Sequence, residues 1–103
     1  MNRERAERVA ADWKPLAALF NALGDTHRQR MLLLFDPDEE LPVKTVAAST
    51  DLSATAAMHH INILRKAGIL KERREGRTIY LSVDRALLAE GLEATLAYIR
   101  EGA

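Results

Sequence analysis

The sequence predicts a mainly α-helical fold that carries one two-stranded β-hairpin, and three features of the 103-residue chain lead to this fold class. Apolar residues recur at three- and four-residue steps over most of its length, which is the spacing of amphipathic helices. Only near residue 78 does the spacing change to strict alternation, which is typical of a strand with one buried face. Hydrophobic residues make up 48% and charged residues 29%, a balance that indicates a folded rather than a disordered chain.

The N-terminal third of the chain predicts three helices in succession. An apolar stripe at helical spacing runs from Val9 to Leu23, and Pro15 interrupts it. Because proline fits only the first turn of a helix, we expect one helix to end before Pro15 and a second to begin there. Gly24 should end the second helix, and Asp25 should cap the third. The apolar side chains of the third helix include those of Met31, Leu32, Leu34 and Phe35.

A helix-turn-helix is predicted after an acidic loop at residues 36–40. A short helix should follow Pro42 and cover about residues 43–50, and residues 51–53 should form a tight turn. The hydroxyl of Ser53 can then accept a hydrogen bond from a free amide in the first turn of a helix over residues 54–67. Gly68 ends that helix, because glycine adopts the left-handed backbone conformation without strain.

A β-hairpin and a final helix complete the predicted fold. Residues 78–83 alternate apolar and polar side chains, so they form one strand, and residues 69–74 form its partner. Glu75-Gly76 is the predicted two-residue turn between them. Asp84 then caps a last helix. This order of helices, helix-turn-helix, hairpin and helix is the plan of a winged helix-turn-helix, and we expect residues 1–103 to form a single domain of this kind.

The charges of the chain are segregated although they sum to zero. Overall, 15 Lys and Arg residues balance 15 Asp and Glu residues. Residues 53–77, however, hold six basic side chains against two acidic ones. A nucleic-acid partner responds to such a local excess rather than to the net charge, so the balance of the whole chain does not exclude one.

The predicted helix over residues 54–67 separates a core face from a polar face. At about 100° per residue, Ala57, Ile61 and Leu64 fall on one side, toward the core. On the opposite side, small residues would let the backbone approach the DNA major groove, polar tips would reach base edges, and cations would meet phosphates. That side carries Ala54, Thr55, Met58, His59, Asn62 and Lys66.

The hairpin adds a second basic feature. Arg73, Arg74 and Arg77 flank its predicted turn, and a wing of this kind can follow the DNA backbone or place an arginine in the minor groove. A solvated helix face, or edge strands protected by charge, would explain each feature alone. A basic hairpin directly after a helix-turn-helix is more specific, and it favours double-stranded DNA as the partner.

Four stretches of the sequence form an ordered set that carries a family resemblance. They are LGDTHRQRML at residues 23–32, LSATAAMHHI at 52–61, LRKAGIL at 64–70 and RREGRTIY at 73–80. This set resembles the ArsR/SmtB family of bacterial winged-helix repressors, and the similarity extends over about residues 16–99. It implies a homodimer, joined through the first and last helices, that binds an imperfect palindrome, represses transcription and releases the DNA when an effector binds.

The resemblance also implies roles for individual residues. The base-contacting positions of the family begin directly after Ser53. Ala54 stands where glutamine is common and Met58 where serine or threonine is common, so these two side chains offer apolar contact to thymine methyl groups. Readout by hydrogen bonds would then rest on Thr55, His59 and Asn62. The helices implied in dimerisation contribute Val9, Trp13, Leu88, Leu92, Leu96 and Ile99.

The two metal sites of the family align with residues that, with one exception, cannot bind a metal. The exception is Asp84, which already has a role as a helix cap. The aligned residues are Pro42, Lys44 and Ala47 at the thiolate site, and Asp84, Ala86, Ala97 and Arg100 at the dimer-interface site.

A new metal site among the three histidines is not expected either. His59 and His60 project about 100° apart on one helix, and His27 lies on another helix. We therefore expect no metal and no cofactor, and for His60 we expect a structural role as a hydrogen-bonding partner.

Other functions are disfavoured by what the sequence lacks. The absence of cysteine removes disulfides, thiolate nucleophiles and Cys-based zinc sites. The sequence has no glycine-rich phosphate loop and no recognisable Ser-His-Asp set, so we expect no catalytic residue and no enzyme. The longest apolar run, residues 31–35, is far shorter than the roughly 20 residues of a membrane span. No signal peptide is readable, so a cytoplasmic protein without a membrane partner is expected.

Two alternatives remain open. The first is a protein-interaction module, because Ala54 and Met58 make the exposed helix face more apolar than a typical DNA-reading face. The second is the same regulator gated by a small organic effector between the helices. Trp13, Phe20 and Tyr98 can line such a pocket, although aromatic residues at helical spacing usually belong to the core.

Overall fold

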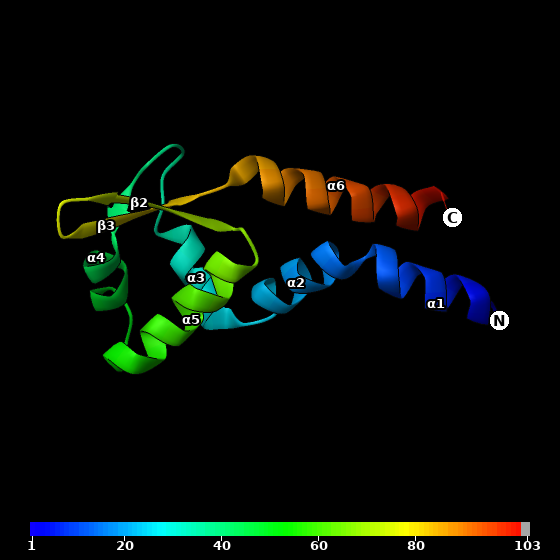
Figure 1. The fold of residues 1–103 in the computed structure, drawn as a ribbon, viewed down its shortest axis with the longest axis horizontal. Coiled ribbons are helices and arrows are strands. Elements are labelled where there is room, and N and C mark those ends of the chain that lie inside the picture. The colour runs from blue at the N-terminus through cyan, green and yellow to red at the C-terminus, as the bar shows by residue number, and fades with distance from the viewer. Residues whose placement is uncertain (102–103) are drawn as a thin grey trace.

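The protein has one globular end from which two helical segments extend. The computed structural model describes residues 1–101, without the side chains of residues 9–12. The first and last helices extend side by side away from the sheet, and both chain ends lie at the far end of a molecule that measures 51 × 26 × 21 Å (Figure 1). The elements are α1 (Arg3–Asp12), α2 (Lys14–Leu23), α3 (Thr26–Leu33), β1 (Leu41–Pro42), α4 (Val43–Ala48), α5 (Ala54–Lys66), β2 (Leu70–Glu75), β3 (Thr78–Val83) and α6 (Arg85–Glu101).

The N-terminal helices break where the sequence predicts. Trp13 separates α1 from α2, and Pro15 lies in the first turn of α2, where its missing N–H costs no hydrogen bond. Gly24 caps the C-terminus of α2. Asp25 caps the N-terminus of α3, as predicted, because its side chain accepts hydrogen bonds from two backbone amides of the first turn.

Helix α3 ends earlier than its apolar pattern predicts. Leu34 is the C-cap, and Phe35 lies beyond the helix. The N–H groups of these two residues bond to the carbonyls three residues earlier, Met31 and Leu32, so the last turn is tightened. Pro37 follows closely, and the residue before a proline disfavours the helical region.

The sheet has three antiparallel strands in the order β1-β3-β2, not the two that the sequence predicts. β1 is only two residues long, with Leu41 opposite Leu81 and Pro42 opposite Tyr80. A two-residue strand has no alternation to detect, and its proline cannot donate to the ladder. The sequence pattern therefore carried no signal for β1.

The hairpin turn lies one residue later than predicted. Glu75 still pairs with Thr78, so the turn consists of Gly76 and Arg77 rather than Glu75 and Gly76. Gly76 has φ +59°, and a positive φ at the first central position is the feature of a type II′ turn.

The core sits between α2, α3, α4, α5 and the sheet. Ala57, Ile61 and Leu64 of α5 are completely buried, as the helical spacing predicts. Gly68 has φ +80° and reverses the chain, so that the Ile69 N–H bonds to the Leu64 carbonyl at 3.0 Å. The remaining buried apolar residues are Leu19, Ala22, Met31, Phe35, Val46, Ile69, Leu70 and Leu81.

Helix α6 packs on α2 through only part of its length. Asp84 caps its start by accepting a hydrogen bond from Leu87 N–H at 3.0 Å, as predicted. At Gly91 the two helices approach closely, since a Cβ there would lie 2.8 Å from Leu19 Cδ2. No residue of α6 is fully buried. Within residues 1–101, no helix is both long and apolar enough to cross a membrane.

Candidate nucleic-acid interface

Helix α5 presents one complete side to solvent. Ser53 caps its first turn, and the Ser53 hydroxyl accepts a hydrogen bond from Ala56 N–H at 3.1 Å. The three buried residues of α5 hold the helix against the core, so the opposite side stays free for a partner. Its exposed side chains are those of Ala54, Thr55, His59, Asn62 and Lys66.

Met58 differs from these neighbours because it is half-buried beside an open groove. The groove has a volume of about 670 Å³ and lies between α4, the start of α5 and the sheet. Ala54 and Met58 line its helical side, and Arg77 and Tyr80 line its sheet side. The helix face and the basic hairpin that the sequence singled out therefore border the same groove.

The three arginines of the hairpin do not share one surface. Alternate residues of a strand lie on opposite faces, so Arg74 shares a face with the buried Leu70, four residues earlier. Arg73 lies on the other face, beside Tyr80, its pairing partner on β3. Arg77 is exposed in the turn.

Arg73 is held by carboxylates on its own side of the sheet. Its Nε donates to Glu40 Oε2 at 2.8 Å, its Nη2 donates to Glu40 Oε1 at 3.1 Å, and its Nη1 donates to Glu75 at 3.2 Å. The guanidinium also lies 4.8 Å from the centre of the Tyr80 ring. The hydrogen bonds from Arg73 lower the pKa of Glu40, so this pair remains ionised and locally neutral at ordinary pH.

The free positive charge of this region comes from other side chains. Arg65 pairs with Glu72 at 2.7 Å and also donates to the Asn62 Oδ1 at 3.2 Å. By contrast, three of the six basic side chains of α5 and the hairpin form no ion pair with any side chain that the structure describes: Lys66, Arg74 and Arg77. Lys66 lies on the exposed side of α5, and the two arginines lie on the hairpin.

Comparison with known proteins identifies the family. Residues 23–73 match a family described as a helix-turn-helix domain. A cadmium resistance transcriptional regulatory protein CadC homolog from Staphylococcus aureus is 30% identical over 98% of this chain and 84% of its own length. The crystal structure of the ArsR family transcriptional regulator RHA00566 is 25% identical, with a TM-score of 0.74 over 85% of this chain and 89% of that one. The chain belongs to the ArsR family of transcriptional regulators.

The fold is shared with a further ArsR-like structure. The solution structure of a homodimeric winged helix-turn-helix DNA-binding domain from Mycobacterium bovis is 24% identical, with a TM-score of 0.70, and it covers 87% of this chain and 83% of that one. This likeness shows that the ArsR-family chain has the winged helix-turn-helix fold, and its membership of the family makes it a DNA-binding transcriptional regulator. Its helix-turn-helix consists of α4 and α5, and its wing consists of β2 and β3.

This ArsR-family regulator exposes an apolar strip on α6. Leu92 is 48% exposed, Leu96 44% and Ile99 66%, and their spacing of four and three residues places them on one side of the helix. Leu88 continues the strip and is half-buried, as is Trp13, whose ring lies 4.9 Å from that of Tyr98. The side chain of Val9, also expected at the dimer interface, lies outside the described residues.

The positions of the family's metal sites do not fit a metal in this ArsR-family chain. Asp84 uses its Oδ1 to accept the Leu87 N–H, and its Oδ2 lies 3.5 Å from Lys71 Nζ. The other aligned residues offer no donor atom of the kind that binds zinc or a softer metal. They are Pro42, Lys44, Ala47, Ala86, Ala97 and Arg100.

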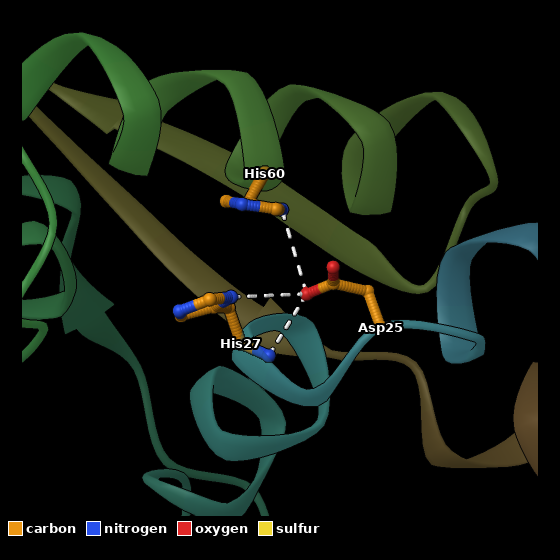
Figure 2. A group of neighbouring side chains, drawn as sticks. All are labelled: Asp25, His27 and His60. Atoms are coloured by element: carbon orange, nitrogen blue, oxygen red, sulfur yellow. Dashed lines mark hydrogen bonds and ion pairs between the residues drawn. The ribbon is translucent and has the colours of Figure 1, made fainter.

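The fold brings together His27 and His60, which the sequence gives no reason to pair because they lie on different helices. The fold stacks the two rings, with centroids 5.4 Å apart, beside the Asp25 carboxylate (Figure 2). Arg28 lies underneath, and its Nη1 is 2.9 Å from His60 Nδ1, so His60 has the hydrogen-bonded role that was expected. Burial lowers the pKa of His60, since it disfavours the charged imidazole.

Proposed function

We propose that this protein is a homodimeric repressor that binds a palindromic operator sequence-specifically and needs no metal to do so. The observation that carries the proposal is the common groove, which is bordered by the exposed face of α5 and by the wing. A surface built of short side chains, hydrogen-bonding tips and unpaired cations suits the major groove and its phosphate rims.

The side chains on this surface divide into readers and anchors. Thr55, His59 and Asn62 read base edges by hydrogen bonds from the exposed side of α5. Ala54 and Met58 contact thymine methyl groups, and Ser53 brings the helix N-terminus to a phosphate. The anchors, which position the protein on the backbone whatever the sequence, are Lys66, Arg74 and Arg77.

The homodimer forms through the apolar strip of α6 together with α1 and α2. An exposed strip of leucine and isoleucine on one helix face is the kind of surface that a second copy covers. Two-fold symmetry then places the two α5 helices about 34 Å apart, one turn of DNA. The homodimeric state of the related Mycobacterium bovis domain supports this arrangement.

Repression without metal is supported by the residues at the family's metal positions, which, apart from Asp84, lack metal-binding donor atoms. The chain then needs another signal to release DNA. An organic effector among the aromatic residues has weaker support, because Trp13 contacts both Phe20 and Tyr98 edge to face.

The test is DNA binding by the full chain in excess chelator. Fragments selected from genomic DNA should bind more tightly than mixed DNA, and His59→Ala should cost about 1–3 kcal/mol per half-site on the selected fragment alone. The matched control is His27→Ala, which removes an exposed histidine from α3 and should leave operator affinity unchanged. Equal binding of selected and mixed DNA, or binding that requires added metal, would overturn the proposal.

A further inference from the structure

We propose that Asp25, His27 and His60 form a binding site for a divalent transition metal of the zinc class, which would join the start of α3 to helix α5. Asp25 and His27 lie at the start of α3, His60 lies on α5 more than 30 positions later in the sequence, and the fold brings one ligand atom of each within 4.8 Å of the others. This inference goes beyond the proposed repressor function and uses none of the family's metal positions.

The ligand atoms already face one another. His27 Nδ1 lies 3.5 Å from Asp25 Oδ1, and His60 Nδ1 lies 3.8 Å from the same oxygen. Figure 2 shows both imidazoles with Nδ1 directed toward the carboxylate. In a tetrahedral zinc site, with bonds of about 2.1 Å, neighbouring ligand atoms are about 3.4 Å apart. Small rotations of the side chains would therefore bring all three onto one ion.

The chemistry of the three ligands suits such an ion. Two imidazole nitrogens and one carboxylate oxygen are the donor types that zinc and nickel accept in proteins. The side chain of His60 is 14% exposed, that of Asp25 31% and that of His27 48%. The cluster is thus closed on the α5 side and open on the His27 side, which gives an ion an entry path and leaves room for water as a fourth ligand.

The ion must compete with Arg28 for His60, and with the backbone N–H groups of His27 and Arg28, which already donate to Asp25 Oδ1 at 2.8 and 3.2 Å. The Nη1 of Arg28 bonds to the His60 Nδ1 that the ion needs, and its positive charge opposes a second cation nearby. Arg28 has two further acceptors, however, since its Nε donates to Ala22 O at 2.8 Å and its Nη2 to Asn21 O at 2.9 Å. Binding therefore breaks one of three hydrogen bonds, and the site should be weaker than a structural zinc site with four protein ligands.

The metal would act on the packing of α5 rather than on DNA directly. His60 is half-buried against α3, whereas its neighbour His59 is on the exposed side of the helix. An ion shared by α3 and α5 binds only the folded chain, because the unfolded chain does not hold the three ligands together. It therefore stabilises the fold.

The experiment titrates Zn²⁺ into the full chain against a chromophoric chelator, after metal has been removed, and repeats the titration with Co²⁺ to record the absorption of a tetrahedral site. We expect one ion per chain. His27→Ala and Asp25→Asn should each weaken binding at least about tenfold, whereas the control His59→Ala should bind as the wild type does. Asparagine keeps the helix cap, so Asp25→Asn tests the charge of the ligand without removing the cap.

A second measurement keeps the inference falsifiable if a variant is unstable. Zn²⁺ at about tenfold its Kd stabilises the fold by about 1.4 kcal/mol, so it should raise the thermal unfolding midpoint of the wild type by about 6–11 °C and leave that of His27→Ala unchanged. Absence of uptake, or equal uptake by wild type and His27→Ala, overturns the site. Because DNA binding is measured in chelator, that result would leave the repressor proposal standing.

Discussion

At the scale of single residues, Arg73 and Arg74 show that neighbouring arginines can have separate tasks. The alternation of the strand sends them to opposite faces of the sheet, and only Arg73 finds carboxylates there. Glu40 and Glu75 raise the pKa of Arg73 through hydrogen bonds, so the residue stays charged but neutralised. We therefore propose that Arg73, expected from the sequence to contact DNA, instead positions the wing, and that Arg74 contacts a phosphate.

Substitution should separate these two tasks. Arg74→Ala or Arg77→Ala should weaken binding to all DNA sequences about equally and reduce the salt slope by about one ion per site removed, because a phosphate contact is lost. Arg73→Ala should leave the salt slope unchanged, because its charge is already balanced by Glu40. The measurement is DNA affinity over a range of salt concentrations. A salt slope reduced equally by Arg73→Ala and Arg74→Ala would contradict the division.

The different surroundings of Arg73 and Arg74 could not be predicted from composition alone. Basic residues near a hairpin turn are visible in the sequence, but their direction depends on the strand register, which is fixed by where the turn begins. The sequence favours a turn at Glu75-Gly76, whereas the turn in the structure is Gly76-Arg77. Both pairs contain the glycine, so the glycine alone does not decide between them. Glu40, the partner of Arg73, lies 33 positions away and is brought close only by β1, which left no pattern to read.

At the scale of elements, the contact between α3 and α5 depends on a polar cluster as well as on apolar burial. Arg28 is almost fully buried, and it bonds to two carbonyls of α2 and to His60 of α5. A protonated His60 could no longer accept the hydrogen bond from Arg28. The stability of this contact therefore depends on a neutral imidazole.

The pH dependence of stability follows from this. Burial lowers the pKa of His60 below its ordinary value of 6.5; Asp25 opposes the shift, and Arg28, His27 and His59 add to it. At a pH between this lowered pKa and 6.5, His60 is protonated in more of the unfolded chains than of the folded ones. The free energy of unfolding therefore falls as the pH drops below 6.5. Denaturant titrations in the presence of chelator, at pH values from 7.5 down to 5.5, measure this decrease in the free energy of unfolding.

A variant assigns that loss to one residue. His60→Asn should flatten the pH dependence over this window, because it removes the group whose protonation differs between the two states. His59→Ala should retain it, since His59 is exposed. An unchanged pH dependence in His60→Asn would show that other groups are responsible.

Most elements could be predicted because their ends are marked by local chemistry. Pro15, Asp25, Ser53, Gly68 and Asp84 each stop or start an element for a reason contained in a few neighbouring residues. The cluster of Asp25, His27 and His60 could not be predicted in this way. It depends on how α3 crosses α5, which is decided by packing between distant parts of the chain.

At the scale of the whole molecule, the two proposed interfaces lie at opposite ends. The wing and the start of α5 lie at one end of the long axis, and α1 and the end of α6 lie at the other (Figure 1). The C-terminal end of α6 thus lies far from the wing and from the start of α5, although Lys66, at the end of α5, lines a groove together with Leu87, Glu90 and Gly91. The C-terminal part of the apolar strip can be altered without touching the wing.

Dimerisation provides the test at this scale. Leu96→Glu places a charge in the middle of the exposed strip, so the dimer should dissociate into monomers at micromolar concentration while the fold is retained. Light scattering after size exclusion measures the mass. Operator affinity should fall steeply, because each monomer then binds a half-site alone. Glu93→Gln, a change on a neighbouring exposed position of α6, is the matched control and should leave the dimer intact.

Because the two ends are far apart, a small rotation of one subunit at the dimer interface produces a large displacement of its DNA-binding end. If the subunits join near the chain ends, a tilt at the joint is magnified along the 51 Å length of each subunit. A rotation of about 4° moves the far end by about 3.4 Å, the rise of one base pair. A small change where the subunits meet would therefore shift one α5 helix by about one base pair relative to the other, so that the two helices could no longer both fit successive turns of the major groove.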